Sequence, residues 1–320
     1  MMRFLACLLI LSATFTAHAE TYSGRDDVRA FIAEMQERNG LDPSMLARLF
    51  ARTKPNAAVI KAIMPPKDPA IRSWATYRSR FVEPRRIAAG LRFWHEHAAE
   101  LARAEAEYGV PAEIILGIIG VETIYGRQTG RFNTFGALAT LAFDYPPRAD
   151  LFRKELEQLL LLAREERRDP LDYRGSFAGA LGLPQFLPSS MRNWGVDFDG
   201  DGKVDLMDPA DAIGSVAKFL KEHGWQKDAP VMFPAVLTGD APAPYDGAPP
   251  RVLPADMPNV AADGAPALPA ALVDFVTPDA PTEYCLGYNN FWVLMRYNRS
   301  SFYAMAVYDL AQALKTAQGR

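Results

Sequence analysis

Apolar residues recur at the three- and four-residue spacing of helices over most of the chain. Between residues 26 and 38, Val28, Phe31 and Met35 fall on one helical face, and Gly40 follows as a stop signal. The same spacing predicts further helices from Asp42-Pro43 onward and over residues 56–64, 84–107, 111–124, 148–167, 289–297 and 301–316. The pattern therefore predicts a mainly α fold.

Two segments depart from this amphipathic pattern. Residues 111–124 are apolar nearly all round, which is typical of a helix buried at the centre of a domain. Residues 228–283 are rich in Pro, Ala and Gly and contain only short apolar pieces. This second segment fits either a small insert with a few short strands or an ordered linker.

Composition adds three constraints. Hydrophobic residues make up 49% of the 320 residues, and the net charge of -3 lacks the basic surplus of a nucleic-acid-binding protein. Residues 1–19 combine Arg3, an apolar run and Ala17-His18-Ala19, which predicts a cleavable secretory signal peptide. Cleavage leaves Cys285 without a partner for a disulfide, and we expect it to be a small buried hydrophobe.

The segment DFDGDGKVDLMDPAD, residues 197–211, has the spacing of an EF-hand calcium loop. Asp197, Asp199 and Asp201 occupy loop positions one, three and five, Gly202 allows the turn at six, and Lys203 offers its carbonyl at seven. A turn with three alternating aspartates and this glycine is hard to explain without a metal. A single loop indicates a structural staple, because a calcium sensor normally carries paired EF-hands.

The end of this loop departs from the EF-hand pattern. Position twelve is Asp208, where an EF-hand carries Glu. Asp208-Pro209 suits the N-cap and first residue of a helix. Asp211 then falls in the first turn of that helix and points back at the loop, so either Asp208 or Asp211 could close the site.

Glu122 is the one acid in the apolar run IILGIIGVETIYG. Apolar surroundings and the negative end of the helix dipole both disfavour its charged form, so we expect a raised pKa. A carboxyl that stays protonated near neutral pH can act as a general acid. The alternative is a structural ion pair between Glu122 and Arg127 or Arg131.

Polar and aromatic residues elsewhere suit a carbohydrate groove. Ser176 and Gln185 lie in a glycine-rich segment, and Tyr297, Asn298 and Tyr303 surround a break between two predicted helices. Aromatic rings stack on sugars, and amides and hydroxyls donate and accept hydrogen bonds to them.

Four segments in this order resemble the membrane-bound lytic transglycosylase B family of bacterial murein-degrading enzymes. They are GVPAEIILGIIGVETIYG, GSFAGALGLPQFLPSS, DFDGDGKVDLMDPADAIGSVAKFL and RYNRSSFYAMAVYDLAQAL, and the resemblance covers residues 70–315. It implies a lysozyme-like helical core with an additional α domain, a small β-containing insert and one EF-hand-like calcium site.

The resemblance also implies domain boundaries and site residues. The boundaries are 1–19 for the signal peptide, 20–90 for an N-terminal α domain, 91–227 for the catalytic core with the calcium loop, 228–283 for the insert or linker, and 284–320 for C-terminal helices that complete the core and groove. The implied residues are Glu122 as the catalytic acid/base, Ser176, Gln185, Tyr297, Asn298, Tyr303 and Tyr77 as substrate contacts, and Asp197, Asp199, Asp201, Asp211 and the Lys203 carbonyl as calcium ligands.

The implied reaction is cleavage of the β-1,4 bond between N-acetylmuramic acid and N-acetylglucosamine without water. A hydrolytic muramidase would need a second carboxylate, for which Asp144 is a candidate by sequence nearness. A calcium-stabilised peptidoglycan-binding protein without catalysis is the other alternative. We expect a monomer that acts on glycan strands in the periplasm, as part of a larger cell-wall remodelling complex, and that needs no organic cofactor. We expect no lipid anchor, because Cys7 precedes most of the apolar run.

Overall fold

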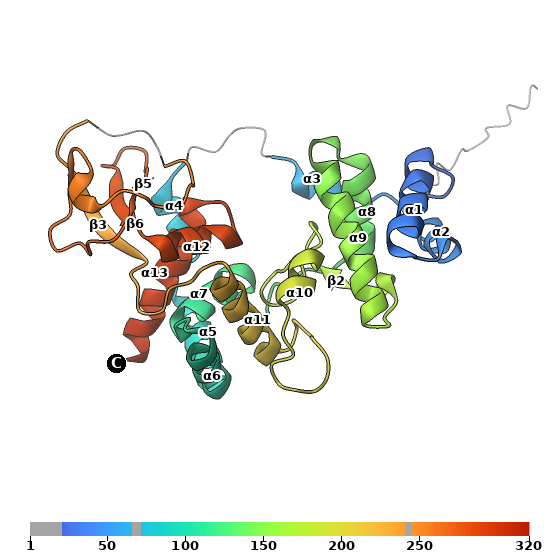
Figure 1. The fold of residues 1–320 in the computed structure, drawn as a ribbon, viewed down its shortest axis with the longest axis horizontal. Coiled ribbons are helices and arrows are strands. Elements are labelled where there is room, and N and C mark those ends of the chain that lie inside the picture. Colours follow the sequence, from blue (N-terminus) through green and yellow to red (C-terminus); the bar gives the residue numbers. More distant parts are fainter. Residues whose placement is uncertain (1–20, 66–71, 241–244, 320) are drawn as a thin grey trace, which may run out of the picture. The chain divides into compact units, whose positions relative to one another are not determined.

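The structure is a computed structural model, and it describes residues 21–65, 72–240 and 245–319 (Figure 1). The predicted signal peptide lies outside the described residues. Residues up to Asn56 form one compact unit, and residues from Ala57 onward form a second. Within the described ranges, no helix combines the length and the apolar character that crossing a membrane requires.

The first unit is a pair of helices. Helix α1 (Asp26–Asn39) ends at Gly40, whose φ of 62° is the left-handed conformation that glycine adopts without strain. Helix α2 (Pro43–Ala51) follows, and Phe31 of α1 meets Phe50 of α2 edge to face with 6.1 Å between ring centroids. Both helices start where the sequence predicted.

The second unit contains the remaining described helices and all the described strands. Its α-helices are α3 (Ala57–Ile63), α4 (Trp74–Ser79), α5 (Pro84–Glu96), α6 (Ala98–Tyr108), α7 (Ala112–Thr123), α8 (Thr134–Asp144), α9 (Ala149–Glu165), α10 (Pro188–Trp194), α11 (Pro209–Glu222), α12 (Asn289–Tyr297) and α13 (Ser301–Gln318). Its strands are β1 (Phe132–Asn133), β2 (Arg174–Gly175), β3 (Met232–Leu237), β4 (Val260–Ala261), β5 (Ala271–Phe275) and β6 (Glu283–Gly287), and its short 3₁₀ turns are η1 (Pro146–Arg148), η2 (Pro170–Asp172) and η3 (Pro254–Asp256). The expected mainly α fold is confirmed.

Helix α7 is the centre of this unit. It packs against α5, α6, α11 and α13, which surround it in Figure 1. Each of its residues except Glu122 is buried, as expected for a helix that is apolar all round. Glu122 is therefore the one residue of α7 whose side chain is partly exposed at the edge of the core.

The prediction of one continuous helix over residues 84–107 was wrong, because the structure has two helices there, α5 and α6. His97 leaves the helical conformation, with φ -121° and ψ 32°, and separates α5 from α6. The two helices serve different neighbours, because α5 packs against α13 whereas α6 packs against α11. One straight helix could not follow both, and the break at His97 changes the direction of the chain.

The first boundary between units falls earlier than the predicted end of the N-terminal α domain at residue 90. The first unit ends at Asn56. Helices α4 and α5 pack against α13 at the other end of the chain. Long-range packing of this kind leaves no sign in the local pattern of residues 57–90.

Residues 228–283 contribute to a folded sheet. Strands β3, β4, β5 and β6 form an antiparallel sheet in the order β4-β3-β6-β5. The last strand, β6, continues to Gly287, past the predicted boundary at residue 283. Cys285 lies on this strand and is buried, so its predicted role as a small buried hydrophobe is confirmed.

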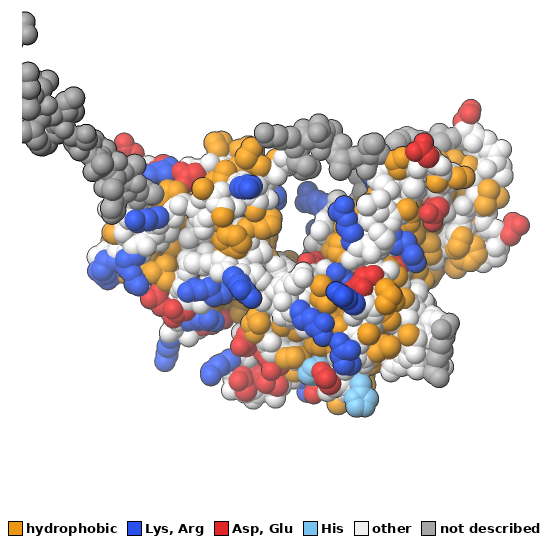
Figure 2. All heavy atoms as spheres, turned by 180° about the vertical axis from the view of Figure 1, so that it is seen from behind, with side chains coloured by type: hydrophobic (Ala, Val, Ile, Leu, Met, Phe, Trp, Pro, Cys, Tyr) orange, Lys and Arg blue, Asp and Glu red, His pale blue; other side chains and the backbone are white. Residues whose placement is uncertain are grey.

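Figure 2 shows charged side chains of both signs, with hydrophobic side chains among them, on one face of the molecule.

Candidate active site

Helix α7 ends immediately after Glu122 in an unusual turn. Ile124 and Tyr125 both have positive φ, 53° and 56°, which costs on the order of 1–2 kcal/mol for each non-glycine residue. Thr123 secures the turn, because its Oγ1 donates to the carbonyl of Leu183 at 2.9 Å and accepts from the amide of Gly126 at 3.0 Å. Strained backbone held by its surroundings is typical of functional sites.

The Glu122 carboxyl is half-buried and has one hydrogen-bond partner. Tyr303 of α13 donates its Oη–H to Glu122 Oε1 at 2.6 Å. Burial raises the pKa of Glu122 to about 7, and the bond from Tyr303 partly opposes this by favouring the charged form. No other carboxylate of the described residues, Asp144 included, contributes to this pKa shift. Arg127 and Arg131 are exposed and form no ion pair with Glu122.

Three tyrosines lie close enough to Glu122 for its negative charge to affect their pKa values. Burial is the main cause that raises the pKa of Tyr77, Tyr297 and Tyr303, and the charge of Glu122 is the second cause in each. The rings of Tyr297 and Tyr303 stack with 6.3 Å between centroids and 13° between planes. The structure thus brings three residues predicted from distant segments to one carboxylate.

A glycine-rich loop, residues 175–186, packs beside the end of α7. Tyr297 Oη donates to the carbonyl of Pro184 at 2.6 Å, which joins α12 to the loop. Gln185 has φ 53°, and its Nε2 donates to the carbonyls of Gly182 at 2.8 Å and Thr129 at 3.2 Å. Ser176 Oγ accepts from the amide of Ala180 at 3.0 Å, and its hydroxyl proton can still be donated.

Asn298 is the predicted site residue with the weakest link to this cluster. It is exposed, it follows α12, and its backbone carbonyl accepts from the amide of Ser300 at 2.7 Å. Among the described residues, no hydrogen bond joins the Asn298 side chain to Glu122, whose partner is Tyr303. Its place in the site rests on its position next to Tyr297.

Two residues that the sequence did not indicate support the end of α7. Arg86 of α5 is only 7% exposed, and its Nη1 donates to the carbonyl of Gly120 at 3.0 Å. The Tyr125 ring fills the space that Gly90 and Gly120 leave free, since a Cβ on either glycine would lie 2.4 or 2.5 Å from Tyr125 Oη. Gly120 in an otherwise bulky apolar run was the one available signal of this close packing.

We expect Gly120→Ala to destabilise the second unit by about 1–3 kcal/mol, because the added methyl group overpacks the contact with Tyr125 and Leu310. Urea unfolding measures the change. Gly319→Ala is the matched control, since a Cβ there meets its nearest atom at 3.7 Å. Equal stability of Gly120→Ala and wild type would contradict the packing described for Tyr125.

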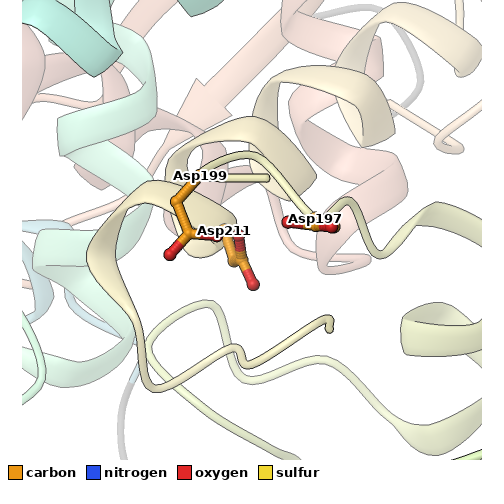
Figure 3. Close-up of side chains that lie close together, drawn as sticks. All are labelled: Asp197, Asp199 and Asp211. Carbon is orange, nitrogen blue, oxygen red and sulfur yellow. The ribbon is translucent and has the colours of Figure 1, made fainter. Parts of the chain in front are cut away.

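Residues 197–211, which we call the acidic loop, bring three carboxylates together. Oxygen atoms of Asp197, Asp199 and Asp211 lie within 4.8 Å of one another (Figure 3). Asp208 instead caps α11, because its side chain accepts from the amide of Ala210. Of the two residues that could close the loop, the structure therefore brings Asp211 to the cluster. Asp201 is exposed, accepts from the amide of Lys203, and lies outside this cluster of three.

Backbone amides hold the three carboxylates in place. Asp211 is buried and accepts from the amides of Phe198 and Asp205, each at 2.7 Å. Asp197 accepts from the amides of Gly200 at 2.7 Å and Gly202 at 2.9 Å. Converging carboxylate oxygens without nitrogen or sulfur donors fit a hard cation such as calcium.

The acidic loop is connected to Glu122 through hydrogen bonds. Leu183 donates its amide to the carbonyl of Leu206 in the acidic loop at 2.8 Å, and its own carbonyl accepts from Thr123, the neighbour of Glu122. A Cβ on Gly182 would lie 2.3 Å from Leu206 Cβ. The glycine therefore permits the close approach of the two loops, and the acidic loop can support the end of α7.

Comparison with known proteins places the chain in a family. Residues 23–312 match the family model "Transglycosylase SLT domain". Membrane-bound lytic murein transglycosylase B of Escherichia coli K12 is 40% identical over 312 residues, which cover 93% of this chain and 85% of the relative.

Two solved structures extend the comparison. The catenated lytic transglycosylase SltB1 of Pseudomonas aeruginosa superimposes with a TM-score of 0.88 at 46% identity, over 93% of this chain and all of that one. The Escherichia coli lytic transglycosylase Slt35, solved in complex with calcium, gives a TM-score of 0.85 at 36% identity, over 95% and 99% of the two chains. Because the family model matches residues 23–312, nearly the whole chain, this chain belongs to the transglycosylase SLT domain family.

Proposed function

We propose that this lytic transglycosylase cleaves the β-1,4 bond between N-acetylmuramic acid and N-acetylglucosamine in peptidoglycan and forms 1,6-anhydromuramic acid ends. The observation that carries the proposal is Glu122, a half-buried carboxyl with a pKa of about 7 and Tyr303 as its hydrogen-bond donor. The family and the murein-cleaving relative support the same substrate.

Glu122 acts first as an acid and then as a base. Its protonated carboxyl donates a proton to the glycosidic oxygen while the bond from that oxygen to muramic C1 breaks. The 2-acetamido group of the substrate stabilises the developing positive charge at C1. Ionised Glu122 then takes the proton of the muramic C6 hydroxyl, and O6 attacks C1 to close the anhydro ring. The carboxyl ends protonated, and no water is consumed.

The surroundings of the Glu122 carboxyl favour this route over hydrolysis. Glycosidases that use water pair an acid with a second carboxylate about 5 to 9.5 Å away. No second carboxylate of the described residues shifts the pKa of Glu122. Ring closure by the substrate's own hydroxyl needs no such partner.

The residues around Glu122 form the substrate groove in this proposal. Tyr77 and Tyr297, which are partly exposed, supply aromatic surface, and Ser176 and Gln185 supply polar groups from the glycine-rich loop. The ring of Tyr303 is buried, at 3% exposed, and Tyr303 acts through its hydroxyl on Glu122. Asn298 provides an exposed amide for an N-acetyl or hydroxyl group. Tyr303 has the additional task of stabilising the ionised form of Glu122 between the two steps, because it donates to the carboxyl.

We assign the acidic loop to structural calcium. Asp197, Asp199 and Asp211 supply carboxylate oxygens, and Asp201 and the Lys203 carbonyl complete the set expected from the loop pattern. When bound, the ion neutralises the gathered negative charge and adds no step to the reaction. The chain acts in the periplasm, where peptidoglycan is found, after removal of the predicted signal peptide.

Mass spectrometry of murein digested with the purified protein tests the reaction. The proposal predicts muropeptides lighter by one water than hydrolysis products and resistant to borohydride reduction. Reducible ends of full mass would show hydrolysis and contradict the proposed reaction. Asp144 would then be the first candidate for the second carboxylate. Retained binding without products would indicate a peptidoglycan-binding protein.

The pH dependence of turnover reports on the protonation of Glu122. Because the first step needs the protonated carboxyl, we expect kcat/KM to fall as pH rises through about 7. Tyr303→Phe removes a bond that favours the charged form, so the falling limb should move to higher pH. Kinetics on a soluble murein fragment measure both profiles. An unchanged limb in Tyr303→Phe would show that this hydrogen bond does not tune Glu122.

A further inference from the structure

Arg86 of α5 is a buried cation without an acidic partner. It is 7% exposed, and among the described residues it forms no ion pair and its buried Nε has no hydrogen-bond partner. Burial is the main cause that lowers the pKa of the Arg86 guanidinium, and the charge of Glu83 only partly opposes this. The ring of Phe81, whose centre is 5.1 Å from the guanidinium carbon, adds a favourable contact. A buried charge with so little compensation lowers the stability of the fold.

The guanidinium is attached to the backbone of the last turn of α7. Its Nη1 donates to the carbonyl of Gly120 at 3.0 Å. The same carbonyl accepts from the amide of Ile124 at 3.2 Å, and Ile124 is the first of the two residues with positive φ that end the helix. Arg86 thus holds the carbonyl on which the turn after Glu122 closes.

The positive charge of Arg86 also lies at the negative end of α7. The last carbonyls of a helix carry partial negative charge, and a cation beside them is favourable. Gly120 is buried, so Arg86 supplies this compensation where bulk water does not reach. The charge of Arg86 is not among the causes that shift the pKa of Glu122, which are burial and the bond from Tyr303. An effect of Arg86 on Glu122 therefore passes through the backbone of α7.

We propose that Arg86 is a positioning residue for Glu122, which fixes the last turn of α7 so that the carboxyl keeps its hydrogen bond with Tyr303 and its place beside the scissile bond. This inference rests on the proposed function. Glu122 has to reach two oxygen atoms in succession, first the glycosidic oxygen and then O6, so a small displacement of the turn disturbs both proton transfers. A role in positioning also explains why a costly charge is kept in the core, because such groups persist where function depends on them.

Arg86→Met removes the charge and keeps an unbranched apolar side chain. We expect kcat on a soluble murein fragment to fall about tenfold with KM unchanged, because the turn loses its anchor while the groove residues stay in place. The variant should melt at or above the temperature of wild type, since it removes a buried charge with little compensation. The falling limb of the pH profile should not move. Arg86→Lys should recover most of the lost kcat, because its ammonium can donate to the Gly120 carbonyl.

Arg85→Met is the matched control, because Arg85 is the exposed neighbour of Arg86 on the same helix and the change in charge is the same. It should match wild type in kcat, KM and melting temperature.

Four results would overturn the positioning role. A wild-type kcat in Arg86→Met would remove it, and a loss carried by KM would make Arg86 a binding residue. An Arg86→Met chain that melts below wild type would make Arg86 part of the fold, and a shifted pH limb would make it a direct modulator of the Glu122 pKa. A wild type that releases no anhydro products would contradict the proposed function itself, which is a different result from an active wild type with an unaffected Arg86→Met.

Discussion

Glu122→Gln is expected to abolish turnover while sugar binding persists. General acid–base catalysis contributes a factor of about 10² to 10⁴, and here one residue serves both steps, so the loss should reach the upper end of that range. Gln keeps the shape of the side chain and can still accept from Tyr303 Oη. Release of anhydromuropeptides measures turnover, and calorimetry with a soluble glycan fragment measures binding.

The pH dependence of the melting temperature provides a second test of Glu122→Gln. The pKa of Glu122 is raised in the fold from its ordinary value of 4.5 to about 7, so the protonated carboxyl contributes stability at low pH that is lost as pH rises through about 7. Gln never ionises. The melting temperature of Glu122→Gln relative to wild type should therefore increase between about pH 5 and about pH 8. Appreciable turnover by a clean preparation would remove Glu122 from its role.

Chelation of calcium is expected to lower the melting temperature by on the order of 5 to 10 °C. A ligand present at about 100 times its Kd stabilises the folded state by about 2.7 kcal/mol, which for a unit of this size corresponds to shifts of that order. Differential scanning calorimetry with calcium and with chelator measures the effect. Turnover should fall as well, because Leu206 of the acidic loop is joined through Leu183 to Thr123.

Asp199→Asn distinguishes the stability that comes from the ion from the stability of the loop itself. Its carboxylate is exposed and accepts only from the amide of Asp201 among the described contacts, a bond that Asn can keep. Burial is the main cause that raises the pKa of Asp211, and the negative charge of Asp199 raises it further, so the two carboxylates repel each other. The variant should melt at or above wild type in chelator and gain much less from calcium.

Asp240→Asn, an exposed position after β3, makes the same change of charge outside the loop and should respond to calcium as wild type does. If calcium left the wild-type melting curve unmoved, the assignment of the acidic loop would be withdrawn. If Asp199→Asn melted lower under both conditions, the residue would instead be part of the fold without the ion.

Local sequence pattern predicted the elements whose stability depends on their own residues. Helices α1, α7, α9, α12 and α13 fall within a few residues of the predicted ranges, because each has an apolar face and a recognisable start or stop. Helix α8 was missed, since its residues Thr134–Asp144 include a glycine and β-branched threonines that weaken the helical signal. The break at His97 was missed for a different reason: it follows from the partners of α5 and α6.

The site divides in the same way. Glu122 could be singled out because an acid in an apolar helix is rare in any context, and the acidic loop could be found because its aspartates lie close together along the chain. Arg86 and Tyr125 could not be found, because an arginine in an amphipathic helix is ordinary until tertiary packing buries it. The choice of Asp211 over Asp208 depended on which side chain α11 uses as its cap.

By itself, then, the sequence determined the helical character of the chain, the candidate acid and the acidic loop, because each depends on residues within about twenty positions of one another. Only the tertiary structure decided that Tyr303, from α13, would donate to Glu122, from α7, and that Arg86, from α5, would donate to the last turn of α7. Contacts between segments far apart in sequence are selected by packing of the whole core, and no local spacing encodes them.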